Sequence, residues 1–180
     1  MNIVKPPPFH AFTVKAQGGR LRELVTPAHV FPARSIIRYF HVTPTEMTIQ
    51  AIWDTGATNT VISRNLVGQL GLIPTGITTA HDANNSYQTS TYLVDIGLPN
   101  GILIPDVQVT EAANLGNYDL LIGMDIITLG DFSVTNGGGN TWFSFRIPPD
   151  GIQIDYVAKA DAIQKKQVRR HQNKLKKMKR

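Results

Sequence analysis

Residues 47–63 read MTIQAIWDTGATNTVIS and combine two apolar segments with a polar loop between them. The first segment, residues 47–53, begins with alternating apolar and polar side chains and ends in an apolar run, which is typical of a β-strand. The pattern stops at residues 54–57, Asp-Thr-Gly-Ala, and resumes at Val61 and Ile62. The stretch therefore predicts a strand, a tight loop that carries one carboxylate, and a second apolar strand.

The carboxylate of Asp54 needs local partners, because burial of an unpaired charge costs free energy. Gly56 lets the backbone turn closely enough for N–H groups to face the carboxylate, and Thr55 offers a hydroxyl. Ala57 keeps its side chain out of the way. Taken alone, Asp-Thr-Gly is also good chemistry for an ordinary turn between strands. A second feature is needed to indicate a catalytic site.

That feature lies at residues 120–130, LLIGMDIITLG, an apolar strand that ends in Gly123 and is followed by a short helix. The two motifs, in this order and at this spacing, resemble the retropepsin-like aspartic proteases from about residue 9 to residue 156, above all their bacterial single-domain members. The resemblance implies an all-β fold with a closed β-barrel and one short helix, equivalent to one acid-protease half, in a homodimer. It also implies a catalytic Asp54, in an active-site loop supported by Thr55, Gly56 and Ala57.

Aspartic peptide hydrolysis uses two carboxylates about 3 Å apart that share one proton, one taking a proton from water while the other donates to the scissile carbonyl. It needs no metal, other cofactor or covalent intermediate. This chain has one such motif: Asp95 lacks the small hydroxyl neighbour, and Asp125 opens a helix. Asp119 and Asp131 fit a turn and a strand start. The second carboxylate is therefore expected from Asp54 of another copy, across a two-fold axis.

Residues 78–94 predict two β-rich arms around a polar tip, and the resemblance implies that this hairpin is the flap that covers a peptide or protein substrate. The expected substrate-binding tip consists of His81, Asp82, Ala83, Asn84, Asn85 and Ser86. Many relatives have glycines at this tip and this chain has none, although Asn can adopt positive φ. This departure keeps open a second hypothesis, a dimer of the same fold that binds peptides without cleaving them.

Further strands are predicted at residues 9–15, 21–31, 36–42, 92–98, 102–109, 131–135, 141–147 and 152–157. Ser63 is expected to cap a helix over residues 64–70 that Gly71 ends. Trp53 is expected in the core, with a role in shaping the pocket as the alternative. The resemblance implies that a terminal strand at 152–157 pairs at the dimer interface.

The composition fits one soluble globular domain with a real core, because 42% of the 180 residues are hydrophobic and 17% are charged. The chain has no cysteine, which excludes disulfides, a thiol nucleophile and a zinc–thiolate site. No apolar run is long enough for a signal peptide or a membrane span. A cytoplasmic location is therefore the expectation.

The positive charge is concentrated at the end of the chain. Residues 159–180 contain ten Lys or Arg and one Asp, a net charge of +9, whereas the preceding 158 residues have a net charge of −4. We expect a Pro-rich arm at 1–8, a protease-like domain at 9–157 and a basic, helix-favouring tail at 158–180. The tail is either a solvated, frayed helix or disordered, or it contacts nucleic acid, ribosomes or acidic membranes. A third hypothesis is a nucleic-acid-binding protein in which the tail binds the nucleic acid and the β domain serves as a dimerisation scaffold.

Overall fold

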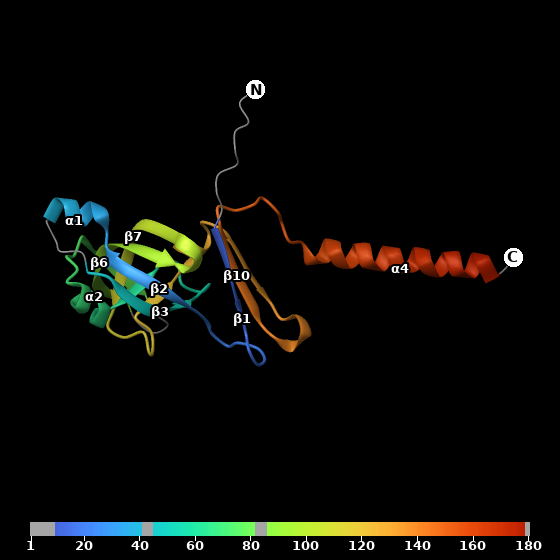
Figure 1. The fold of residues 1–180 in the computed structure, drawn as a ribbon, viewed down its shortest axis with the longest axis horizontal. Helices are drawn as coiled ribbons and strands as arrows, with labels where there is room; N and C mark the ends of the chain where they lie inside the picture. Colours follow the sequence, from blue (N-terminus) through green and yellow to red (C-terminus); the bar gives the residue numbers. More distant parts are fainter. Residues whose placement is uncertain (1–9, 41–44, 82–85, 179–180) are drawn as a thin grey trace, which may run out of the picture. The chain divides into compact units, whose positions relative to one another are not determined.

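The structure, a computed structural model, describes residues 10–40, 45–81 and 86–178. The chain divides into two compact units, Met1–Pro149 and Asp150–Arg180 (Figure 1). The strands of the first unit are β1 (His10–Lys15), β2 (Leu24–Pro32), β3 (Met47–Trp53), β4 (Val61–Ser63), β5 (Gly76–His81), β6 (Ser86–Leu98), β7 (Ile102–Ala112), β8 (Leu120–Ile122), β9 (Asp131–Thr135) and β10 (Trp142–Ile147). The helices are α1 (Arg34–Phe40), α2 (Arg64–Leu70) and α3 (Met124–Ile127) in the first unit, and α4 (Tyr156–Met178) in the second.

The first unit is built around a closed β-barrel. Its strands follow the order β2-β3-β8-β4-β7-β6, and β2 also pairs with β6, which closes the ring. Strand β5 extends from the barrel as a hairpin with β6, and β1, β10 and β9 form a separate antiparallel sheet. The predicted all-β fold with a closed barrel is confirmed. Among the described residues, no helix is long and apolar enough to cross a membrane.

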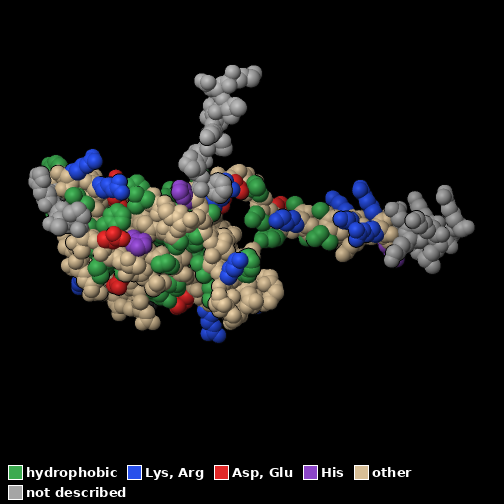
Figure 2. Space-filling view, viewed as in Figure 1, with side chains coloured by type: hydrophobic (Ala, Val, Ile, Leu, Met, Phe, Trp, Pro, Cys, Tyr) green, Lys and Arg blue, Asp and Glu red, His purple; other side chains and the backbone are tan. Residues whose placement is uncertain are grey.

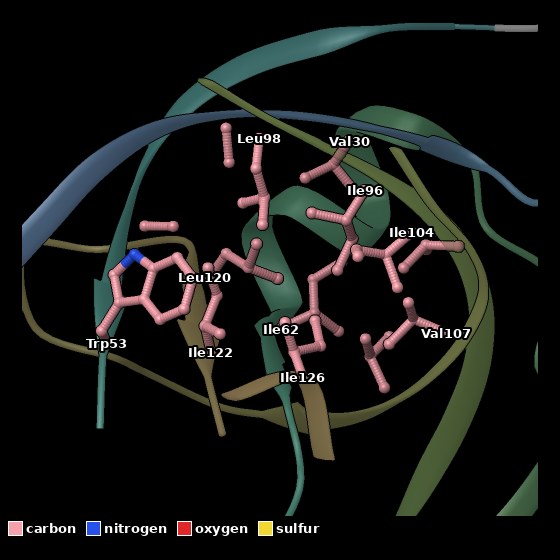
Figure 3. Close-up of a cluster of buried hydrophobic side chains, with 14 of the residues drawn as sticks. Val30, Trp53, Ile62, Ile96, Leu98, Ile104, Val107, Leu120, Ile122 and Ile126 are labelled. Carbon is pink, nitrogen blue, oxygen red and sulfur yellow. The ribbon is translucent and has the colours of Figure 1, made fainter. Parts of the chain in front are cut away.

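Branched aliphatic side chains fill the barrel (Figure 3). Ile62, Leu120 and Ile122 come from the central strands and are fully buried. Trp53 is 5% exposed and lies against Phe143 and Phe145 of the small sheet, with ring centroids 5.2 and 5.1 Å apart. Its indole N–H donates to the Thr26 hydroxyl at 2.9 Å, which satisfies the one polar atom of the ring. The structure therefore places Trp53 in the core, where the main expectation had it.

Two short helices follow different rules. For α2 the sequence signals hold: the Ser63 hydroxyl accepts from Leu66 N–H at 3.1 Å, and Gly71 ends the helix with φ 60°. The strand predicted at 36–42 is wrong, because residues 34–40 form α1. Ser35 donates to the Asp106 carboxylate, and Ile37 N–H bonds the carbonyl of Ala33, so tertiary anchoring overrides the β-branched composition. Residues 41 and 42 lie outside the described residues.

The terminal strand predicted at 152–157 is also wrong in the single chain. Residues 152–155 have no regular structure, and α4 begins at Tyr156. A strand needs a partner for its backbone groups, whereas the Asp155 carboxylate caps the helix by accepting from Val157 and Ala158 N–H at 2.8 and 2.9 Å. The strand at the interface of a dimer remains a prediction.

Strand β8 lies between the two strands of the 47–63 stretch. It pairs in parallel with β3 and antiparallel with β4. The two strands that the loop joins are therefore separated in the sheet by β8. Directly after β8, Gly123 approaches that loop so closely that a Cβ atom there would lie 2.6 Å from the carbonyl carbon and oxygen of Asn59. Only glycine fits this contact, because the neighbouring atoms are backbone and cannot rotate away.

We predict that Gly123→Ala destabilises the fold by about 2 kcal/mol or more, since the added methyl group must displace backbone. Gly68→Ala, in α2, is the matched control: nothing lies within 4 Å of the position that its added Cβ atom would take. The control should leave stability unchanged or raise it by up to about 1 kcal/mol through helix propensity. Urea unfolding of both variants measures the difference, and equal midpoints would show that the close contact at Gly123 is not needed.

A nearly buried carboxylate ties the barrel strands to α2. Glu111 on β7 is 8% exposed and accepts from Arg64 Nε at 2.7 Å and from the Tyr92 hydroxyl at 2.7 Å. Burial by itself raises the pKa of Glu111, but the hydrogen bonds from Arg64 and Tyr92 and the Arg64 charge outweigh it and hold the pKa below its usual 4.5. The ionised form is therefore the one that the fold stabilises.

Because this pKa is lowered on folding, the stabilisation by Glu111 is complete above the unfolded pKa and is lost as pH falls through the folded pKa. We predict that Glu111→Gln costs about 1–2 kcal/mol of unfolding free energy at pH 7, and less at a pH below about 4. Glu46→Gln is the control, because Glu46 forms an exposed pair with His29 that should contribute less than about 1 kcal/mol. Denaturant curves at both pH values that show the same loss for Glu111→Gln would contradict this account.

Candidate active site

The loop at residues 54–57 leaves β3 at the end of its pairing with β8. Trp53 lies opposite Ile122 in the parallel ladder, and Asp54 N–H continues this ladder with a bond to the Ile122 carbonyl at 2.9 Å. Asp54 is therefore held by the barrel itself, at the position where both strands end. A side chain fixed in this way varies little in position, as a catalytic group requires.

The loop then turns around the Asp54 side chain. Gly56 N–H donates to Asp54 Oδ1 at 2.8 Å, and Ala57 N–H donates to the Asp54 carbonyl at 3.3 Å. A Cβ atom on Gly56 would lie 3.1 Å from the same Oδ1, which is tighter than an ordinary contact. Asp54 and Ala57 are half-buried, and Thr55 and Gly56 are exposed. The carboxylate thus has one backbone donor and stays accessible from outside.

The second motif, residues 120–130, is hydrogen-bonded to this loop. Met124 N–H donates to the carbonyl of Ala57 at 2.8 Å, and Asp125 N–H donates to that of Thr58 at 3.1 Å. These bonds join the start of α3 to the loop next to the tight contact at Gly123. The two stretches that are separated by more than sixty residues in the sequence are therefore one structural unit.

The Asp125 side chain stabilises this unit by binding Thr60, a contact that we call the brace. Its Oδ1 accepts from the Thr60 hydroxyl at 2.7 Å and its Oδ2 from Thr60 N–H at 2.9 Å. Thr60 is fully buried, and its hydroxyl oxygen also accepts from Gly123 N–H at 3.2 Å. The sequence indicated that Asp125 begins a helix but not that it binds Thr60. No local spacing pairs these two residues, so only the fold reveals the brace.

The remaining candidate carboxylates are engaged away from the loop. Asp95 is 1% exposed, accepts from Asp106 N–H at 2.9 Å and lies 3.5 Å from Arg34 Nε. Asp119 accepts from the Ser63 hydroxyl, and Asp131 begins β9. These positions fit the structural roles expected for them. Within the described residues, no group of three or more His, Asp or Glu side chains could hold a metal ion.

The predicted flap arms form the hairpin of β5 and β6. Their ladder runs from the pair Gly76 and Thr91 to the pair His81 and Ser86, where the His81 ring nitrogen Nδ1 lies 2.7 Å from the Ser86 hydroxyl. The structure thus confirms the two arms within 78–94 and brings two of the six tip residues together. The other four predicted tip residues, Asp82, Ala83, Asn84 and Asn85, lie outside the described residues.

A pocket of about 380 Å³ lies between the base of this hairpin and α3. Asn59, at the end of the loop, lines it together with Thr78 of β5, Gln108 of β7 and Leu129 after α3. Asp54 does not line it. Sequence reasoning did not select Asn59 or Gln108, because an amide on a strand or loop carries no distinguishing pattern.

Known protein families and solved structures include proteins that are similar to this chain. Residues 42–128 match the family model described as "gag-polyprotein putative aspartyl protease". A comparison with curated proteins gives no match.

Among solved structures, a retropepsin-like aspartic protease from Rickettsia conorii is 11% identical, with a TM-score of 0.48 over 79% of this chain and 98% of that chain. The retroviral protease-like domain of Ddi1 from Leishmania major is 16% identical, with a TM-score of 0.39 over 73% of this chain and 99% of that one. The foamy viral protease-reverse transcriptase, in complex with RNA/DNA hybrid, is 18% identical, with a TM-score of 0.40 over 59% of this chain and 12% of that one.

The family match includes the loop that begins at Asp54, the braces at Thr60 and Asp125, and the tight contact at Gly123. Through residues 42–128, the chain is similar to the putative aspartyl proteases of gag polyproteins, in agreement with the resemblance of its two motifs to retropepsin-like aspartic proteases.

Proposed function

We propose that the protein is an aspartic endopeptidase in which two copies of Asp54, one from each chain of a homodimer, hydrolyse a peptide bond. The observation that carries the proposal is the loop itself. Asp54 is held at the end of the β3–β8 ladder, its Oδ1 accepts from Gly56 N–H at 2.8 Å, and it remains accessible. The family match over the same residues supports this function.

The proposed chemistry needs two carboxyl groups that share one proton, because two like charges about 3 Å apart cannot both be ionised. The ionised Asp54 takes a proton from a water molecule as that water attacks the scissile carbonyl carbon. The protonated Asp54 of the other copy donates its proton to the carbonyl oxygen. Collapse of the tetrahedral intermediate breaks the C–N bond: the leaving nitrogen takes up the proton that the first Asp54 received from water, and a hydroxyl of the intermediate returns a proton to the second Asp54. The Gly56 N–H group keeps each carboxylate oriented through these steps.

The second copy follows from the count of motifs. One chain has one Asp-Thr-Gly-Ala loop, so one chain supplies half of the site. A two-fold axis between the loops places Thr55, which is exposed, next to its equivalent in the other chain. Ile152 and Ile154, which are 71% and 54% exposed, alternate like strand residues and would gain burial by pairing with a second chain. Both features support a dimer.

Replacement of Asp54 tests the chemistry. We predict that Asp54→Asn lowers peptidase activity by at least about a thousandfold, because an amide cannot accept a proton from water, while fold and dimer persist. Asp161→Asn, on the exposed helix α4, is the matched control and should retain full activity. Cleavage of a peptide library, followed by mass spectrometry, gives the readout. Undiminished cleavage by Asp54→Asn would refute the assignment, and peptide binding without cleavage by the unmodified protein would favour a binding module.

A mixing experiment tests the shared site. Unmodified chains and Asp54→Asn chains are combined in equal amounts and allowed to exchange partners at a constant total concentration. If each site needs Asp54 from both chains, only dimers of two unmodified chains are active. Activity then falls to about one quarter of that of unmodified chains alone at the same total concentration. A site complete within one chain would retain about one half. The measured fraction therefore separates the two arrangements without knowledge of the natural substrate.

A further inference from the structure

The barrel and its active-site loop leave the basic helix α4 without a role. Residues 150–180 form a unit of their own, and α4 runs for 23 residues, from Tyr156 to Met178. Every side chain from Tyr156 to Gln172 is exposed. Lys and Arg side chains recur along this helix in the space-filling view (Figure 2). Among the described residues of α4, no face is packed against the rest of the chain, so the surface chemistry of the helix must be explained by solvent or by a partner.

The charges on α4 are segregated. Lys159, Lys166 and Arg170 are spaced by seven and four residues, which places them along one side of a helix. Lys165 and Arg169, four residues apart, form a second row beside the first. Each residue advances the helix by about 1.5 Å, so the five cations extend over about 16 Å of its length. We name these five side chains the basic face.

From Ala160 to His171, the opposite side of α4 is uncharged. Ala160, Gln164, Gln167 and His171 follow one another at spacings of four, three and four residues and carry no formal charge at pH 7. A helix that lies in a membrane surface places large apolar side chains opposite its basic ones. A coiled coil needs an apolar seam that repeats every seven residues. After Tyr156, the described part of α4 has Val157, Ile163 and Val168 as large apolar side chains, and their spacings of six and five residues form neither pattern, so its uncharged side is suited to face water.

We propose that the basic face binds the phosphate backbone of a nucleic acid duplex. A duplex presents about one phosphate charge per 1.7 Å of its axis, so the five cations face about ten phosphates. Arg169 and Arg170 carry planar guanidinium groups that can bond a phosphate with two N–H groups at once. Tyr156, whose ring centroid lies 5.3 Å from Lys159 Nζ, is the one Phe, Tyr or Trp from Tyr156 to Gln172, so no aromatic row follows the cations to stack on successive bases. Binding is therefore independent of nucleotide sequence.

The charge balance of the rest of the chain adds to the argument. Residues 1–158 have a net charge of −4, whereas residues 159–180 have +9, so attraction to phosphate is confined to the tail. The acidic part repels the same polyanion. This difference favours a geometry in which nucleic acid contacts α4 and not the barrel. The inference does not depend on the proposed peptidase activity.

The test measures binding of the full chain to a DNA duplex of about 24 base pairs and arbitrary sequence by fluorescence anisotropy. The measurement is made between about 50 and 200 mM NaCl and is repeated with an RNA duplex. The neutralised variant combines Lys165→Gln, Lys166→Gln, Arg169→Gln and Arg170→Gln, which keep good helix propensity. The matched control combines Ile163→Ala, Gln164→Ala, Gln167→Ala and Val168→Ala, which changes four residues of α4 and leaves all its charges. Circular dichroism confirms that both variants keep their helix.

The unmodified chain should bind both duplexes, with a logarithmic affinity that falls linearly as the logarithm of salt concentration rises. The neutralised variant should lose at least about tenfold in affinity at about 100 mM NaCl, and its salt slope should decrease by about 3 to 4, about 0.9 for each lost phosphate contact. The control should bind within about twofold of the unmodified chain. A preference for one of the two duplexes would identify the natural polymer.

Three results would overturn the proposal. A flat salt response of the unmodified chain would do so without any variant. An equal loss of affinity in the control would show that the uncharged side chains of α4 carry the binding, as in contact with a second copy. Binding to vesicles rich in anionic lipid without binding to either duplex would assign the helix to a membrane surface.

Discussion

The backbone contact between Gly123 and Asn59 is the constraint on which the rest of the barrel depends. Strand β8 can lie between β3 and β4 only if the chain after it passes close to the loop that joins those strands. A glycine permits this approach, and the N–H groups of the next two residues then bond to the loop carbonyls. The position of Asp54 is set by the same contact, because its N–H continues the ladder that β8 completes.

Carboxylates in this chain fall into two groups, which their hydrogen-bond partners distinguish. Asp125 and Glu111 each receive two or more hydrogen bonds from side chains and backbone, and they join segments that are distant in the sequence. Asp54 receives one backbone bond from its own loop and remains accessible. A structural carboxylate saturates its oxygens with donors, whereas a catalytic one must keep an oxygen free for water and substrate.

The chain separates its charges as it separates its compact units. An acidic β unit carries the candidate active site, and a basic helix follows in a unit of its own. Charges of opposite sign on one chain let each unit meet a different partner, which we propose to be an extended peptide at the barrel and a polyanion at α4. Within the described part of α4, the side opposite the basic face carries mostly small and amide side chains, which water can solvate without cost to the helix.

The sequence by itself determined the strand–loop–strand around Asp54, the second motif that ends in Gly123, the α2 caps at Ser63 and Gly71, and the helical tail. These features depend on short-range chemistry: side-chain periodicity, capping oxygens and permissive glycines. Only the tertiary structure decided that residues 34–40 form a helix, that residues 152–155 stay unpaired, and that Thr60 binds Asp125. The helix at 34–40 and the Thr60–Asp125 pair depend on partners distant in the sequence, and local periodicity carries no information about which partners the fold brings near. Residues 152–155 alternate like a strand, but among the described residues no neighbouring strand pairs with them.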